Sequence, residues 1–194
     1  MDSSEDCHSK NVASVRDLMP QLYHELHQLA ERYMEPSRQG YHTLQPTAVV
    51  HEVFLRMSHY SPDQLFASKR HFYAAAAESM RQFLIEYQRR RTAAKRGGKA
   101  VRLSMPLEMV EDPQKQDVDV LELDDALGML AAVEPAKAEL VKLRFFCGLS
   151  IAEAAEQMEI STATADRWWA FCKAFLALKM GDDAHESRTG DATD

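Results

Sequence analysis

The 194-residue chain has little cysteine and no long apolar run. It has three cysteines, Cys7, Cys147 and Cys172, and no two of them form a Cys-x-x-Cys motif. This odd number and wide spacing argue against a disulfide framework or a thiolate zinc site. No stretch approaches the roughly 20 apolar residues of a membrane-spanning helix, so no membrane insertion is expected. The acidic, polar start, MDSSEDCHSK, is unlike a secretory signal, and a cytoplasmic location is predicted.

Signatures of catalysis and of metal binding are also missing. The sequence has no glycine-rich phosphate loop, no nucleophile motif and no paired-carboxylate signature. Its histidines are scattered, and nothing in their spacing makes three or four metal ligands converge. We therefore predict that the protein is not an enzyme and has no catalytic residue, no metal site and no cofactor.

Charge is distributed unevenly along the chain. The net charge of −7 argues, taken as an average, against a nucleic-acid partner. However, residues 13–102 carry 14 Lys and Arg against 8 Asp and Glu, whereas residues 120–180 carry nine acidic against six basic residues. This asymmetry predicts a basic domain joined to an acidic one.

Hydrophobic periodicity predicts helices and no strand of useful length. Apolar residues recur at three-four spacing from Val15 to Tyr33, and a second helix follows near 49–57. A long helix is predicted from about Lys69 to about Lys95, and Gly97-Gly98 would end it. The next stretch, up to about residue 118, has two prolines and no sustained period, which is typical of a linker.

Capping signals organise the C-terminal part. Pro135 is expected to be the first residue of a helix, and Ser150 and Glu153 match a capping box. Ser161 is the expected N-cap of the last helix. We predict an all-α fold of two small helical domains, the second containing a helix-turn-helix. The predicted parts are an N-terminal domain at 13–98, a flexible linker at 99–118, a C-terminal domain at 119–180 and a disordered acidic tail at 181–194.

The segment from Leu149 to Phe175 has the spacing of a helix-turn-helix, although an ordinary pair of packed helices gives a similar pattern. In its last helix the spacing turns Ala165, Trp169 and Cys172 inward. Thr164, Arg167, Trp168 and Phe171 then point outward.

A basic run extends from Arg81 to Arg102 and contains eight bases with Glu86 as its one acid. Such a cluster can neutralise phosphates and bind nucleic acid in a salt-sensitive way without choosing a sequence. A solvated basic helix face is the alternative interpretation.

Four stretches, in order and together covering about half of the chain, carry a family resemblance. They are LYHELHQLAERYM at 22–34, HTLQPTAVVHEVFLRM at 42–57, HFYAAAAESMRQFLIEYQRRRTAAKRGG at 71–98, and VEPAKAELVKLRFFCGLSIAEAAEQMEISTATADRWWAFCKAFL at 133–176. The chain resembles bacterial RNA polymerase sigma factors of the extracytoplasmic-function (ECF) group, and is most similar to a branch abundant in planctomycetes.

This resemblance implies partners and sites. The partners would be core RNA polymerase and promoter DNA, with an anti-sigma factor or another regulator left open. The implied polymerase-binding residues are His51, Glu52, Leu55 and Arg56. The implied DNA-binding residues of the promoter-melting helix are Arg81, Arg89, Arg90, Arg91, Lys95 and Arg96. Those of the recognition helix are Ser161, Thr164, Arg167, Trp168, Phe171 and Lys173.

The recognition helix departs from the family pattern. Asp166 stands where a base is usual, Ala170 where arginine is common, and Trp168 at a usually polar position. Fewer positive charges weaken phosphate binding. An alternative is therefore a sigma-derived regulatory or adaptor protein whose C-terminal domain binds a protein; a classical helix-turn-helix repressor is a third.

Overall fold

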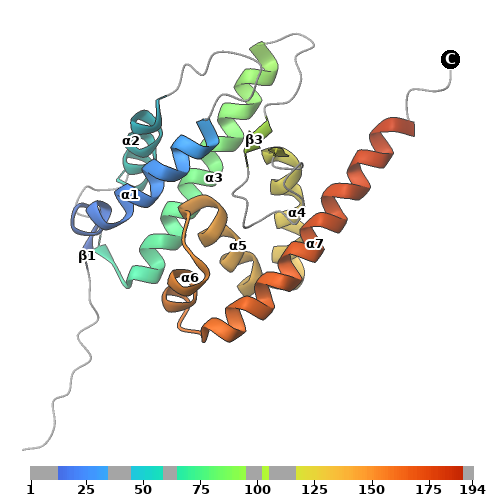
Figure 1. The fold of residues 1–194 in the computed structure, drawn as a ribbon. Coiled ribbons are helices and arrows are strands. Elements are labelled where there is room, and N and C mark those ends of the chain that lie inside the picture. Colours follow the sequence, from blue (N-terminus) through green and yellow to red (C-terminus); the bar gives the residue numbers. More distant parts are fainter. Residues whose placement is uncertain (1–12, 35–44, 59–64, 95–101, 105–116, 190–194) are drawn as a thin grey trace, which may run out of the picture.

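The computed structural model describes residues 13–34, 45–58, 65–94, 102–104 and 117–189. Within these ranges the fold is all-α, as predicted, with only short strands beside the helices (Figure 1). The helices are α1 (Val15–Met34), α2 (Pro46–Met57), α3 (Lys69–Ala94), α4 (Val120–Val133), α5 (Pro135–Cys147), α6 (Ile151–Gln157) and α7 (Thr162–Thr189).

Two antiparallel strand pairs join segments that are distant in the sequence. β1 (Ala13–Ser14) pairs with β2 (Leu65–Phe66), and β3 (Arg102–Ser104) pairs with β4 (Asp117–Asp119). β3 and most of β4 fall inside the predicted linker, which therefore contains paired backbone at its two ends. Strands of two or three residues are too short to show an alternating pattern, so the sequence did not reveal them.

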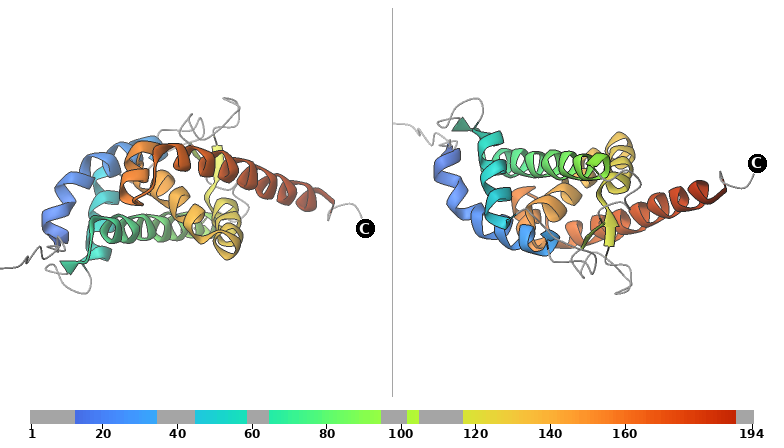
Figure 2. Two further views of the ribbon diagram at one scale, coloured as in Figure 1. Left: turned by 90° about the horizontal axis from the view of Figure 1, so that it is seen from below. Right: turned by 90° about the horizontal axis from the view of Figure 1, so that it is seen from above.

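The N-terminal helices pack around a core of aliphatic and aromatic side chains. α1 packs on α2, and α2 on α3. Pro20 lies inside α1, where proline removes a backbone hydrogen bond and favours a bend; α1 changes direction along its length (Figure 2). The core includes Leu22, Leu26, Val53 and Phe72, all fully buried.

The predicted caps of the C-terminal helices are confirmed. Pro135 opens α5, and Gly148, at a φ of 75°, ends it in the left-handed conformation that glycine favours. Ser150 and Glu153 form the capping box of α6. Glu159, in the turn before α7, also has a positive φ, of 57°. Local chemistry thus defines where each of these helices begins and ends.

Helices from both predicted domains contribute to one cluster of buried side chains. α3 lies between α2 on one side and α5 on the other, and α5 is the helix against which it packs most extensively (Figure 2). The close approach is visible at the end of α5, where the Cys147 thiol donates to the Tyr73 carbonyl at 3.4 Å. The division into two domains remains a prediction.

Polar residues along one face of α3, which we call the α3 polar stripe (Arg70, Glu78, Arg81 and Gln88), bind the C-terminal helices. Arg70 donates two hydrogen bonds to Glu139 of α5, at 3.0 and 2.7 Å. Glu78 accepts from Lys142 of α5 at 3.0 Å. Arg81 forms an ion pair with Asp124 of α4, and Gln88 donates to Asp119, the N-cap of α4, at 2.7 Å.

α7 is longer than expected. It continues to Thr189, which corrects the prediction of a disordered tail for residues 181–189. No proline interrupts this stretch, and the single Gly181 costs a helix only about 1 kcal/mol. Residues 190–194 of the predicted tail lie outside the described residues.

Glu78 provides a pH-dependent test of the α3 contacts. Burial raises the pKa of its carboxyl, but hydrogen bonds from Arg81 and Lys142 outweigh that effect and lower the pKa from 4.5 to about 2. A lowered pKa stabilises the fold above the unfolded value of 4.5, and this contribution is lost as the pH falls towards 2.

We expect Glu78→Gln to lower the free energy of unfolding at pH 7 by about 1–2 kcal/mol, allowing for solvent screening of a part-exposed group. The difference from wild type should shrink between pH 4.5 and 2, in urea unfolding followed by circular dichroism. Glu156→Gln, at an exposed carboxyl of α6, is the control. A constant difference across this range would contradict the prediction.

Candidate nucleic-acid and protein interfaces

The C-terminal end of α3 presents exposed arginines. Arg89 and Arg90 are both exposed, and the Arg90 side chain is 81% accessible although it forms a loose 3.5 Å ion pair with Glu86. Arg91 belongs to α3, but its side chain is not described, and Lys95 and Arg96 lie outside the described residues. Of the predicted basic cluster, Arg89 and Arg90 are therefore the members that the structure places in solvent.

Arg81 does not join these arginines. At 100° per residue, it lies about 180° around α3 from Arg90. Its guanidinium donates to Glu78 and to Asp124, and the two partners of the Arg81–Asp124 pair are only 24% and 20% exposed. In this conformation Arg81 connects α3 to α4 and is not available to a phosphate.

The predicted polymerase-binding residues of α2 differ in their surroundings. His51 and Leu55 are exposed, and Leu55 is 46% accessible although it is apolar. Glu52 is half-buried and accepts a 3.0 Å hydrogen bond from Arg56. His51, Glu52 and Leu55 thus reach the surface of the helix.

Arg56 has a structural role within the fold. Its guanidinium donates two hydrogen bonds to Glu86 of α3, at 3.1 and 2.9 Å, and lies 5.8 Å from the centre of the Phe83 ring. The hydrogen bonding of Arg56 to the Glu86 carboxylate is the main reason that the pKa of Arg56 is raised. Arg56 therefore holds α2 against α3.

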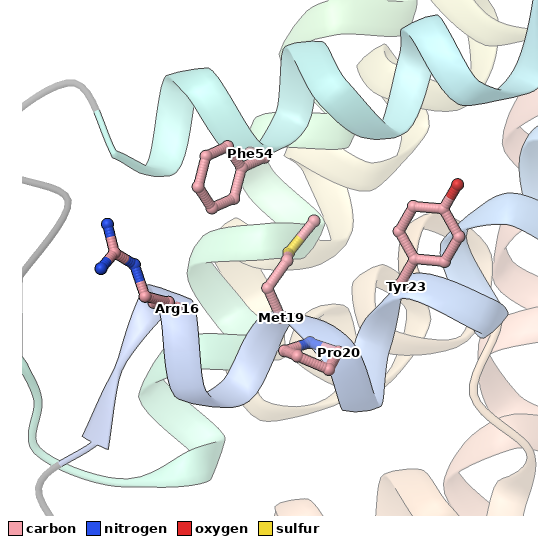
Figure 3. A pocket seen from close by; sticks show the side chains of 5 residues that line it. All are labelled: Arg16, Met19, Pro20, Tyr23 and Phe54. Atoms are coloured by element: carbon pink, nitrogen blue, oxygen red, sulfur yellow. The ribbon is translucent and has the colours of Figure 1, made fainter.

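A surface pocket lies beside α2, and it was not predicted from the sequence. It has a volume of about 420 Å³ and is lined by Arg16, Met19, Pro20, Tyr23 and Phe54 (Figure 3). Four of these residues come from α1, for which the sequence predicted an amphipathic helix and no binding site. The only signal in the sequence was an aromatic residue, Tyr23, beside the apolar positions of α1, and a single surface aromatic is common in proteins. In the structure its ring is 45% accessible.

The start of α7 is a well-capped polar turn. The Ser161 hydroxyl accepts from the Thr164 backbone N–H at 3.2 Å, as predicted for an N-cap. Arg167 is exposed and donates to the Thr164 hydroxyl at 3.3 Å. Asp166 is also exposed, so this surface carries an acid beside its nearest base.

The adjacent tryptophans have different environments. Trp169 is 8% exposed, and the Arg144 guanidinium stacks 4.2 Å from the centre of its ring. The predicted inward face of α7 is confirmed, because Ala165 and Cys172 are fully buried beside it. Arg144 is itself buried, so the pair forms part of the C-terminal core.

Trp168 is half-buried and not fully outward as the spacing suggested. Lys137 of α5 places its ammonium 6.0 Å from the Trp168 ring centre and 4.6 Å from that of Phe171. Phe171 is exposed and stacks on Phe175. Lys173, the last predicted recognition residue, is half-buried. The outer face of α7 is therefore more aromatic than basic.

The described part of the chain offers no cluster of three or more histidine, cysteine or acidic side chains placed to bind a metal ion. Cys147 and Cys172 are buried and unpaired, and burial raises the pKa of Cys172 to about 11. Cys7 lies outside the described residues. None of the described helices has the length and apolar character to cross a membrane.

The fold and these surfaces define an all-helical protein with an exposed basic helix end and a capped, aromatic C-terminal helix. Residues 6–182 match the family model described as ECF sigma factor, and the chain belongs to this family. Membership implies a role in transcription initiation, with core RNA polymerase and promoter DNA as partners. No match was found among curated proteins or among solved structures.

Replacing each of the two adjacent tryptophans should reduce stability by different amounts. Trp169→Ala should lower the free energy of unfolding by about 3–5 kcal/mol, because it empties a buried site and leaves Arg144 without its stacking partner. Trp168→Ala should cost only about 1 kcal/mol, since its ring is already part-exposed. Urea unfolding of both variants checks this, and equal destabilisation would contradict it.

Proposed function

We propose that this ECF sigma factor binds core RNA polymerase through α1 and α2 and contacts promoter DNA through the end of α3 and the start of α7. The observation that carries this proposal is the family match from residue 6 to residue 182, which spans all of these helices. In the proposed organisation, residues 13–98 and 119–180 act as two domains joined by 99–118.

The polymerase-binding surface would consist of His51, Glu52 and Leu55, flanked by the pocket that contains Tyr23. Two observations support this choice. Leu55 and Tyr23 are exposed apolar or aromatic side chains, the residue types that anchor protein interfaces. Arg56 would act indirectly, because its hydrogen bonds to Glu52 and Glu86 orient α2.

The DNA-binding surface would depend mainly on the basic end of α3. Arg89 and Arg90 are exposed, and the residues that follow, Arg91, Lys95 and Arg96, would extend the positive charge. Such a surface binds phosphates without choosing a sequence, and would assist strand separation at the promoter. Duplex DNA carries dense negative charge, so this contact should be strongly salt-dependent.

α6 and α7 would form the helix-turn-helix that reads the upstream promoter element. Ser161, Thr164, Arg167, Trp168, Phe171 and Lys173 are its proposed contact residues. Because Asp166 is exposed beside Arg167, this helix would contribute little to phosphate binding, and its contribution would lie in base contacts. A sigma-derived adaptor function is not favoured by the family match.

We also propose that the protein is cytoplasmic and is not an enzyme. It would belong to the planctomycete-type branch of the family, and an anti-sigma factor could bind it. Association with core polymerase in a pull-down, followed by run-off transcription on genomic fragments, tests the main function. We expect both association and new transcripts. Lack of association at low salt would overturn the proposal.

Removing the exposed arginines should change the salt dependence of DNA binding. For Arg89→Ala with Arg90→Ala, we expect the slope of log K against log salt to decrease by about two, since each phosphate contact contributes about 0.9. Lys179→Ala, which removes a positive charge from α7, is the control and should leave the slope unchanged. Fluorescence anisotropy with a DNA duplex at several salt concentrations measures the slope for each variant. If the slope decreased by the same amount per positive charge removed in the arginine variant and in Lys179→Ala, the prediction would be contradicted.

Substitutions of two neighbouring residues of α2 should have different effects, one on polymerase binding and the other on the stability of the fold. Leu55→Ala should weaken core-polymerase binding about tenfold while leaving the melting temperature unchanged, because its side chain is exposed. Arg56→Ala should instead lower the free energy of unfolding by about 1–2 kcal/mol, because Glu86 loses its partner. Thermal melts and polymerase titrations of the two variants check this; unchanged polymerase affinity of Leu55→Ala would contradict it.

A further inference from the structure

We propose that the chain forms a weak two-fold dimer, in which an exposed strip of α4 in one copy binds an exposed strip of α7 in the other. The proposal goes beyond the proposed function and does not depend on it. The α4 strip consists of Asp125, Met129 and Val133. The α7 strip consists of Phe175, Leu178 and Lys179.

Exposed apolar side chains are concentrated on these two helices. In the described part of the chain, four of the six large apolar side chains that reach solvent belong to α4 and α7. Met129 is 49% exposed, Leu178 60% and Val133 64%, which is more than for Tyr23 or Leu55 of the N-terminal helices. Apolar patches of this kind mark sites of interaction with other proteins.

Each strip occupies one side of its helix. At 100° per residue, Met129 and Val133 lie about 40° apart around α4, and Phe175 and Leu178 lie about 60° apart around α7. The two helices pack against each other and cross (Figure 1). The strips therefore lie on two helices in direct contact, and one copy of the chain presents both.

The strips carry opposite charges. Asp125 lies one turn before Met129 on α4, and Lys179 lies one turn after Phe175 on α7. Both charged side chains are exposed, and neither forms an ion pair within the residues that the structure describes. Residues 126–133 contain no charged side chain at all. The α4 strip is thus apolar with an acidic end, and the α7 strip is apolar with a basic end.

A second copy of the chain is the occupant that this pattern fits. A two-fold interface uses every contact twice, so the α4 strip of each copy meets the α7 strip of the other. Asp125 then faces the partner's Lys179 in both halves of the interface. A different protein would need an acidic and a basic strip in the same arrangement, whereas a second copy already has both.

The available surface sets the strength of this contact. Four apolar side chains that are about half exposed offer on the order of 400 Å² per copy, whereas a standard interface buries about 800 Å² on each partner. The two ion pairs lie at the rim, where solvent and salt screen them. We therefore expect a dissociation constant on the order of 10–100 µM.

Sedimentation velocity of the full chain tests self-association. Between about 5 and 300 µM protein, the weight-average mass should rise from 22.0 kDa towards twice that value, because a weak dimer forms by mass action. Leu178→Glu should weaken the association at least tenfold. Leu55→Glu makes the same change at an exposed leucine of α2 and should leave the association unchanged. Circular dichroism confirms that both variants are folded.

A charge exchange tests the pairing of the strips. Asp125→Lys and Lys179→Asp each place like charges in both halves of the dimer, and each should weaken self-association about fivefold. An equimolar mixture of the two variants restores both ion pairs in the mixed dimer and should associate as strongly as wild type. Recovery on mixing requires a contact between copies, because a change within one copy would persist in the mixture.

A wild-type mass that stays at 22.0 kDa over the whole range would overturn the dimer. So would equal weakening by Leu178→Glu and Leu55→Glu, or a mixture that associates no better than the single variants. A monomeric wild type whose polymerase binding is weakened by Leu178→Glu would assign this surface to the polymerase instead. Failure to bind core polymerase and support transcription would overturn only the proposed function, since sedimentation uses neither polymerase nor DNA.

Discussion

The packing of α3 between α2 and α5 is the constraint on which the other features depend. One side of α3 completes the apolar core with α1 and α2, and another side binds α4 and α5 through charged pairs. Its C-terminal end carries Arg89 and Arg90 in solvent. One continuous helix therefore carries the contacts to the N-terminal helices, the contacts to the C-terminal helices and the exposed arginines.

The two proposed DNA-facing surfaces differ in their physical chemistry. The end of α3 is positively charged and offers long-range attraction to phosphate. The start of α7 is capped and aromatic, with Asp166 beside Arg167 and with Lys137 stacked against Phe171. Lys137 also pairs with Glu134 at 2.6 Å, so it adds little free charge. Attraction to DNA phosphates would therefore come from α3, and discrimination between base sequences would come from α7.

The sequence predicted those features that depend on neighbouring residues. Pro135, the capping box of Ser150, and the burial of Trp169 all follow from local spacing and local hydrogen bonding. Arg81 was assigned to DNA as part of a basic run, and Arg56 was assigned to the polymerase from the family resemblance. The acids that bind them, Asp124 and Glu86, lie 43 and 30 positions away in the sequence. The sequence shows that an arginine is charged, but only the fold shows which acidic side chain pairs with it. The paired ends of the predicted linker were missed because strands of three residues are too short to show an alternating pattern.

The double anchoring of Arg56 affects how α2 meets a partner. An arginine free in solvent samples many rotamers, and fixing it on binding costs conformational entropy. Here Glu52 and Glu86 already hold the guanidinium while Phe83 lies beside it. The surface next to Leu55 is therefore preorganised, so a partner that binds there loses less conformational entropy in fixing Arg56.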